Sequence, residues 1–83
     1  MSDLAVEFLC SQFDVACYQV GAVFESAPDG SAIPEMERDL WFVSVPVGSG
    51  MDELVNDIPL ATSEKEAQVL AVRHLSLEAR WMQ

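Results

Sequence analysis

Residues 63–82 read SEKEAQVLAVRHLSLEARWM, and this stretch decides the C-terminal part of the fold. Ser63 followed by Glu66 forms a capping box, in which two side chains satisfy free backbone donors at the start of a helix. One broad, largely apolar stripe then recurs at helical spacing and comprises Ala67, Leu70, Ala71, His74, Leu75, Trp81 and Met82. The sequence therefore predicts a C-terminal helix with one buried face.

Two earlier segments change to a period of two, which is the spacing of β-strands. Residues 15–25 form the first, with an apolar face of Ala16, Tyr18, Val20, Ala22 and Phe24. Residues 40–47 form the second, with Trp41, Val43, Val45 and Val47 on one face and Pro46 near its end or at an edge. Residues 26–31 (SAPDGS) have the composition of a turn. Antiparallel pairing is the simplest topology, because parallel strands require a crossover connection.

The N-terminal segment has a helical pattern from Ser2 to Phe13. Ser2 suits an N-cap, Asp3 suits the positive end of the helix dipole, and one face gathers Ala5, Val6, Leu9 and Phe13. Leu4 and Phe8 lie off that stripe, so a fully buried helix or a strand is the alternative.

Between the second strand and the final helix, residues 48–50 (GSG) end the strand. Residues 51–57 suit a short helix with Leu54, Val55 and Ile58 turned inward, and residues 58–61 are a candidate third strand. The fold class is α+β: an N-terminal helix, a small antiparallel sheet of two or three strands, and a C-terminal helix packed on the sheet.

Length and charge limit the classes to which the protein can belong. The chain has 83 residues, which suits a single domain over 1–83, and its 51% hydrophobic content favours a packed core. The formal net charge is −10, and all of this excess lies in residues 1–57, where eleven acidic residues stand against Arg38 alone. Such a chain lacks the cations needed to neutralise phosphates, so direct binding to nucleic acid or to an anionic membrane is disfavoured.

Cysteine usage and hydropathy indicate a compartment. Cys10 and Cys17 are the only cysteines, and their spacing matches no redox motif. The chain has neither the features of a signal peptide nor an apolar run long enough to span a membrane. The expectation is a cytoplasmic protein with both thiols reduced.

The sequence offers few groups of residues that could form a catalytic or metal-binding site. His74 lies one helical turn before Glu78, a spacing more typical of a surface pair than of an acid–base pair. A thiol paired with the single histidine would need a lowered pKa, which acidic surroundings oppose. Asp52, Glu53 and Asp57 follow a glycine-rich turn but do not match a calcium-binding loop. We therefore expect no enzymatic activity, no cofactor and no metal site.

The acidic surface is the more informative feature, because a charge of this size exceeds the range that a small domain commonly carries for solubility. Ordinary solubility charge or a halophilic host is the alternative interpretation. We predict a partner with a basic surface, in a monomer or homodimer. The residues predicted to face it are Glu25, Asp29, Glu35, Glu37, Asp39, Asp52, Glu53 and Asp57. Val69 and Val72 lie off the main stripe of the final helix and suggest a second contact surface.

The size, the acidity and the capped final helix after a short strand (residues 58–67, IPLATSEKEA) resemble small phage or prophage inhibitor proteins of the anti-CRISPR type. Several proteins of that type are similar to DNA in charge, with carboxylates in place of phosphates. The resemblance implies a non-catalytic inhibitor that blocks the basic nucleic-acid-binding surface of a host protein. It transfers no functional residue, so the acidic residues above come from charge placement alone. The alternative is a small adaptor or antitoxin-like subunit that binds a basic partner.

Overall fold

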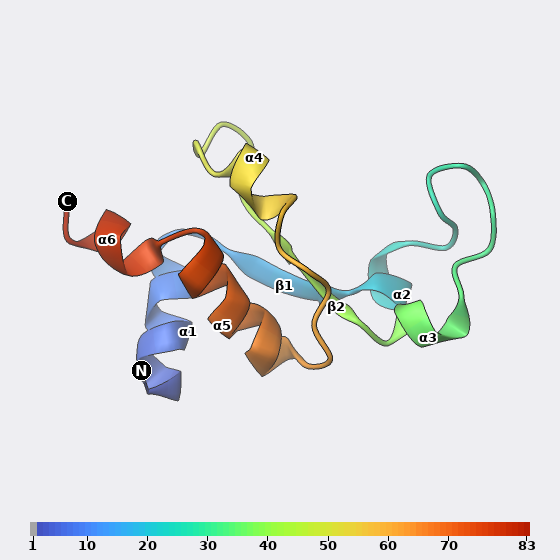
Figure 1. Cartoon of the computed structure of the whole chain (residues 1–83), viewed down its shortest axis with the longest axis horizontal. Coiled ribbons are helices and arrows are strands. Elements are labelled where there is room, and N and C mark those ends of the chain that lie inside the picture. The colour runs from blue at the N-terminus through green and yellow to red at the C-terminus, as the bar shows by residue number, and fades with distance from the viewer. Residues whose placement is uncertain (1) are drawn as a thin grey trace.

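The computed structural model describes residues 2–83 and shows an α+β fold, as predicted. Its elements are α1 (Asp3–Gln12), β1 (Ala16–Gln19), α2 (Val20–Val23), α3 (Glu35–Arg38), β2 (Trp41–Ser44), α4 (Asp52–Val55), α5 (Glu64–His74) and α6 (Leu77–Trp81). The molecule is elongated, 42 × 27 × 16 Å, with α1, α5 and α6 at one end and α2 and α3 at the other (Figure 1).

The sheet consists of β1 and β2, paired antiparallel as predicted. Cys17 lies opposite Val43, and Tyr18 lies opposite Phe42. The candidate third strand over 58–61 is reduced to a single bridge, in which Trp41 and Ala61 exchange backbone hydrogen bonds of 2.8 and 2.9 Å. Ala61 is buried, so this bridge closes the edge of β2 over the core.

The first strand is shorter than its pattern predicts and turns its other face inward. The prediction extends to residue 25, but β1 ends at Gln19, and Val20–Val23 form the helical turn α2. Cys17, not Tyr18, packs against the core, and Tyr18 and Phe24 are 46% and 47% exposed. Helix α5 contacts both strands from the Cys17–Val43 side, and that contact decides which face is buried.

The second strand follows the predicted alternation. Val43 is buried, and Trp41 and Val45 pack against the core. Val47 was predicted on the same face but is 98% exposed, because β2 ends at Ser44 and the chain leaves the sheet.

The core lies between α1, α5 and the face of the sheet that carries Cys17 and Val43. Ala67 and Ala71 have no exposed surface, and their small side chains let α5 approach the strands closely. Predicted core residues Val6 and Leu9 of α1 are buried, whereas Leu4 and Phe8 are exposed. The buried apolar set is Val6, Leu9, Cys10, Val15, Val43, Met51, Ala61, Ala67, Ala71, Val72, Leu75 and Leu77.

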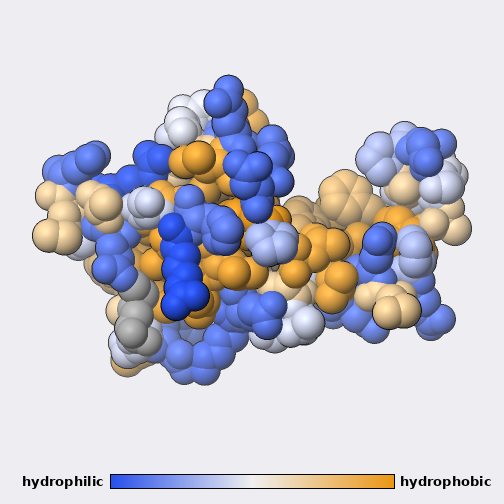
Figure 2. Space-filling view, in the orientation of Figure 1, coloured by the Kyte–Doolittle hydropathy of each residue, from blue (hydrophilic) through white to orange (hydrophobic). Residues whose placement is uncertain are grey.

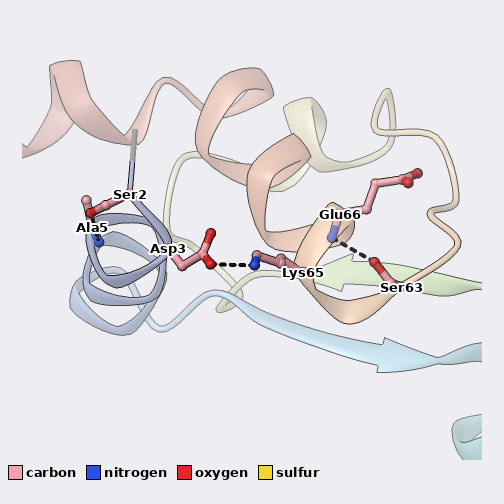
Figure 3. A network of polar contacts seen from close by, with 6 residues as sticks. All are labelled: Ser2, Asp3, Ala5, Ser63, Lys65 and Glu66. Atoms are coloured by element: carbon pink, nitrogen blue, oxygen red, sulfur yellow. Dashed lines mark hydrogen bonds and ion pairs between the residues drawn. The ribbon is translucent and has the colours of Figure 1, made fainter.

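Side-chain caps fix where the two long helices begin (Figure 3). Ser2 Oγ accepts from the Ala5 amide at 3.2 Å, and Ser63 Oγ accepts from the Glu66 amide at 3.1 Å, as predicted for both caps. The Glu66 carboxylate reaches back to Thr62, accepting from its hydroxyl at 2.9 Å and from its amide at 3.4 Å. An ion pair between Lys65 and Asp3 joins the starts of α5 and α1.

The C-terminal helix is interrupted at Ser76, which adopts a left-handed conformation (φ 52°). Leu75 and Leu77 are both fully buried, and one continuous helix would point these side chains in nearly opposite directions. The Arg80 guanidinium donates to the Leu75 carbonyl (Nε···O 2.8 Å) and so satisfies the end of α5. The prediction of one continuous apolar stripe was therefore wrong at its C-terminal end: Leu75 is buried, but His74, Trp81 and Met82 are exposed.

Two further predictions need correction, one of an outward face and one of an inward face. Val72 is 4% exposed and Val69 packs against the core, because α1 lies along that side of α5; they form no free second contact surface. In the segment after β2, Val55 and Ile58 pack inward as predicted, but Leu54 is exposed and Met51 is buried. In the part of the chain that the structure describes, no helix has the length and apolarity needed to cross a bilayer.

Candidate partner-binding surface

All eight predicted partner-facing acids are exposed, and the fold divides them into two groups. Five belong to the lobe formed by α2, the 24–34 segment and α3 with its C-cap Asp39, which we call the acidic lobe: Glu25, Asp29, Glu35, Glu37 and Asp39. Three lie on or just after α4: Asp52, Glu53 and Asp57. Helix α4 and the acidic lobe project separately from the sheet, and Figure 2 shows apolar residues between these two hydrophilic regions.

The tip of the acidic lobe is held by short-range hydrogen bonds. Ser26 and Ala32 form an antiparallel bridge, and the Ala27 amide donates to the Ser31 carbonyl at 2.9 Å. Asp29 Oδ1 accepts from the Ser31 hydroxyl at 2.6 Å and from the Ser31 amide at 3.0 Å. These bonds stabilise the carboxylate and hold the pKa of Asp29 below its ordinary value. Asp29 therefore shapes the turn and stays ionised.

The base of the acidic lobe depends on Arg38, the only cation of the first 57 residues. Its guanidinium donates to the Gly21 carbonyl (Nη2···O 3.3 Å) and ties α3 to α2. A β-carbon on Gly21 would lie 3.0 Å from Arg38 Cβ and 3.1 Å from the Arg38 carbonyl oxygen. Arg38 thus packs so closely against the backbone of Gly21 that a residue with a β-carbon would be crowded there.

The α4 group also includes one structural carboxylate. Asp52 accepts from the Gly48 amide (3.2 Å) and the Ser49 hydroxyl (3.2 Å), which closes the glycine-rich turn before α4. Gly48 has a positive φ (80°), a conformation that glycine adopts without strain. Glu53 and Asp57 are exposed on the same projection.

Little of this charge is compensated by ion pairs. Within residues 2–83 the single ion pair is Lys65–Asp3, at the opposite end of the molecule from the acidic lobe (Figures 1 and 3). Arg38, the cation inside the lobe, bonds a carbonyl oxygen instead of a carboxylate. The exposed carboxylates of the lobe therefore present their negative charge to solvent.

The two thiols are free and poorly suited to nucleophilic chemistry. Burial raises the pKa of Cys10, whose Sγ lies 3.9 Å from the Gln68 carbonyl oxygen as a weak donor. Burial, then the nearby Cys10 and Glu64, raise the pKa of Cys17 to about 11. Both thiols hence stay protonated near neutral pH, whereas a nucleophilic cysteine needs its thiolate.

Other candidate groups are not brought together. His74 is exposed at the end of α5, and the break at Ser76 places Glu78 in the next helix. Among the residues that the structure describes, no three His, Cys, Asp or Glu side chains converge on a position where a metal ion would fit.

An apolar pocket of about 450 Å³ lies within the acidic lobe, and the sequence reasoning did not find it. Val20, Phe24 and Ile33 line it together with Glu37. The alternating pattern predicts Val20 and Phe24 on one face of a strand. In the structure they lie beside Ile33 because the chain turns at α2. The apolar residues inside a charged loop, Pro28 and Ile33, were the available signal.

No protein-family model, curated protein or solved structure matches this chain. What its surface offers chemically is a set of exposed carboxylates that form no ion pair within residues 2–83, beside an apolar pocket. Exposed charge attracts and orients an oppositely charged partner, and apolar anchors prolong the complex. This combination can attract a cationic group and offer it an apolar contact.

Proposed function

We propose that this protein is a non-catalytic inhibitor that binds the basic, nucleic-acid-binding surface of another protein. The supporting observation is the acidic lobe, where five exposed carboxylates have no ion-pair partner among residues 2–83 and the one local cation is engaged by a backbone carbonyl. Carboxylates in this arrangement compete with phosphates for the same lysine and arginine side chains.

The mechanism is occupation of the partner's surface. The net charge of −10 accelerates the encounter with a positively charged groove, and this acceleration falls as salt screens it. Once docked, the lobe leaves no room for the nucleic acid, so inhibition is stoichiometric and competitive. The proposal places the protein in the cytoplasm, with its target.

The two acidic groups have different parts in this mechanism. The acidic lobe is the primary contact, because it combines charge with an apolar pocket. The α4 group projects separately and adds long-range attraction. Asp29 and Asp52 also hold their own turns, so replacing them would change loop structure as well as charge. Glu35 and Glu37 are therefore the better residues for testing binding.

Affinity capture tests the proposal directly. Tagged protein is used to retain partners from bacterial lysate at low and at moderate salt, and the retained material is challenged with duplex and single-stranded DNA. We expect a nucleic-acid-binding protein that is released by DNA. A partner that stays bound when DNA is added would indicate the adaptor function. Recovery of no specific partner at either salt concentration would overturn both functions.

A matched pair of variants separates local charge from net charge. Glu35→Lys/Glu37→Lys reverses two carboxylates in the acidic lobe, and Glu7→Lys/Glu78→Lys reverses two exposed carboxylates near the other end. Both doubles change the net charge equally. We expect the lobe double to lower the association rate and its salt dependence much more than the control double does. Equal effects would mean that net charge alone drives the encounter.

A further inference from the structure

The pocket in the acidic lobe has apolar walls and one charged group. Five apolar residues and Ser26 line it, with Glu37 as the charged lining residue. The apolar set is Val20, Phe24, Ala27, Pro28 and Ile33. The lining residues come from α2, the 24–34 segment and α3, so the pocket exists only when the lobe is folded back on itself.

The walls are positioned by contacts below the pocket. Phe24 packs against Phe42 of β2, with ring centroids 5.5 Å apart, yet 47% of Phe24 is exposed. The Arg38–Gly21 hydrogen bond fixes α3 against α2 and so sets Glu37 across from the α2 residues. The pocket is thus held by packing and hydrogen bonding, with an aromatic ring and a carboxylate available to a ligand.

We propose that this pocket receives an arginine side chain of the basic partner; the inference rests on the proposed function and names the chemistry of its contact. An arginine has an apolar stem for the walls and a planar guanidinium for the Glu37 carboxylate. The same guanidinium stacks on the exposed ring of Phe24. The surrounding carboxylates draw a cationic segment to this place.

Other single side chains fit this combination less well. An apolar side chain would cover Glu37 without pairing its charge, which is costly. A lysine ammonium is a strongly hydrated point charge that neither forks onto a carboxylate nor stacks as a plane on a ring. Arginine is the side chain that satisfies the walls, the ring and the carboxylate together.

The experiment measures how substitutions at two residues of α3 change the affinity for two peptides. The probes are a fluorescein-labelled peptide of repeated Arg-Ser-Gly and its counterpart with lysine in place of every arginine. Their affinities are measured by fluorescence anisotropy for the wild-type chain, Glu37→Gln and Glu35→Gln. Both substitutions remove one exposed charge from the same helix, but only Glu37 lines the pocket.

We expect Glu37→Gln to weaken binding of the arginine peptide about fivefold, and Glu35→Gln to weaken it less than about twofold. The lysine peptide should bind the wild-type chain more weakly and should respond equally to both substitutions. If both peptides bind and neither distinguishes Glu37 from Glu35, the arginine pocket is wrong while the basic-partner function stands. If neither peptide binds at low salt, both are wrong.

Two isoleucines provide an independent readout in one spectrum. Ile33 lines the pocket, whereas Ile58 packs against the core and does not line the pocket; the chain has no other isoleucine. With δ-methyl labelling, the arginine peptide should shift the Ile33 methyl resonance and leave that of Ile58 in place. Binding without a shift of Ile33 would overturn the pocket assignment, even if anisotropy showed affinity.

Discussion

The side chain of Arg38 and the backbone of Gly21 meet at the base of the acidic lobe, where Nη2 donates to the carbonyl oxygen at 3.3 Å. This contact joins α3 to α2 across the connection between the strands. It also engages the only cation of the first 57 residues without neutralising a carboxylate. One local interaction therefore shapes the lobe, which carries five acidic side chains against this one cation.

Gly21→Ala tests this close approach. The added β-carbon would lie 3.1 Å from the Arg38 carbonyl oxygen, and backbone cannot move aside as a flexible side chain can. We expect a loss of about 1–3 kcal/mol in the free energy of unfolding, measured by urea denaturation. Ala22→Ser, at the exposed neighbouring position, should change stability by less than about 0.5 kcal/mol. A stabilised Gly21→Ala variant would show that helix propensity outweighs the contact.

Ser63→Ala tests the cap of α5. The Ser63 hydroxyl accepts from the Glu66 amide at 3.1 Å, and its loss leaves that amide without its partner (Figure 3). We expect a cost of about 1 kcal/mol, seen as a lower midpoint of thermal unfolding. The matched control is Ser2→Ala at the cap of α1, which should cost less because α1 contacts α5 and α6, whereas α5 contacts α1, α6 and both strands. Equal losses would argue against a dominant role for α5.

Val72→Ala and Val47→Ala test the corrected core. Val72 is 4% exposed between α5 and α1, whereas Val47 is 98% exposed after β2. Removing the same two methyl groups should cost about 2 kcal/mol at Val72 and less than about 0.5 kcal/mol at Val47. Chemical denaturation measures both. A small loss at Val72 would restore it as a surface residue.

The stability of the protein should depend on pH through Cys17. Its pKa rises from 9.0 to about 11 on folding, so the unfolded chain loses the thiol proton at lower pH than the folded chain. The contribution of this thiol to stability is thus complete below pH 9.0 and is lost as pH rises toward about 11. We expect the free energy of unfolding to fall more steeply across this window for the wild type than for Cys17→Ala.

Alkylation by iodoacetamide gives a second measure of the same thiol. In a Cys10→Ala background, the alkylation rate at Cys17 should rise with pH toward a midpoint well above the ordinary thiol pKa of 9.0. A rate that levels off near the ordinary thiol pKa would mean that burial does not protect Cys17.

Much of the fold was predictable because its signals are local. The caps at Ser2 and Ser63 and the apolar residues of α1 act within a few residues of sequence, and the structure confirms them. The exposure of the eight acids was also predictable, since ionised carboxylates remain in water unless they are paired. The pairing of the strands followed from their alternating pattern.

The apolar pocket was beyond sequence reasoning for a physical reason. Val20 and Phe24 fit the period of a strand, and only the close packing of Gly21 on Arg38 shows that the chain turns there. That contact joins residues 17 positions apart. The division of the acids into two groups likewise depends on where α4 leaves the sheet.

By itself, the sequence determined the two capped helices, the antiparallel strand pair and a surface with excess negative charge, because capping, periodicity and charge solvation act over short ranges. Only the tertiary structure decided that Cys17 faces inward and Tyr18 outward, that the last helix breaks at Ser76, and that Val72 is buried. Strand β1 and helix α5 carry apolar residues on both of their faces, and Ser76 lies between two buried leucines. For such positions the packing of α5 against α1 and the sheet selects one face, and that selection requires the whole chain.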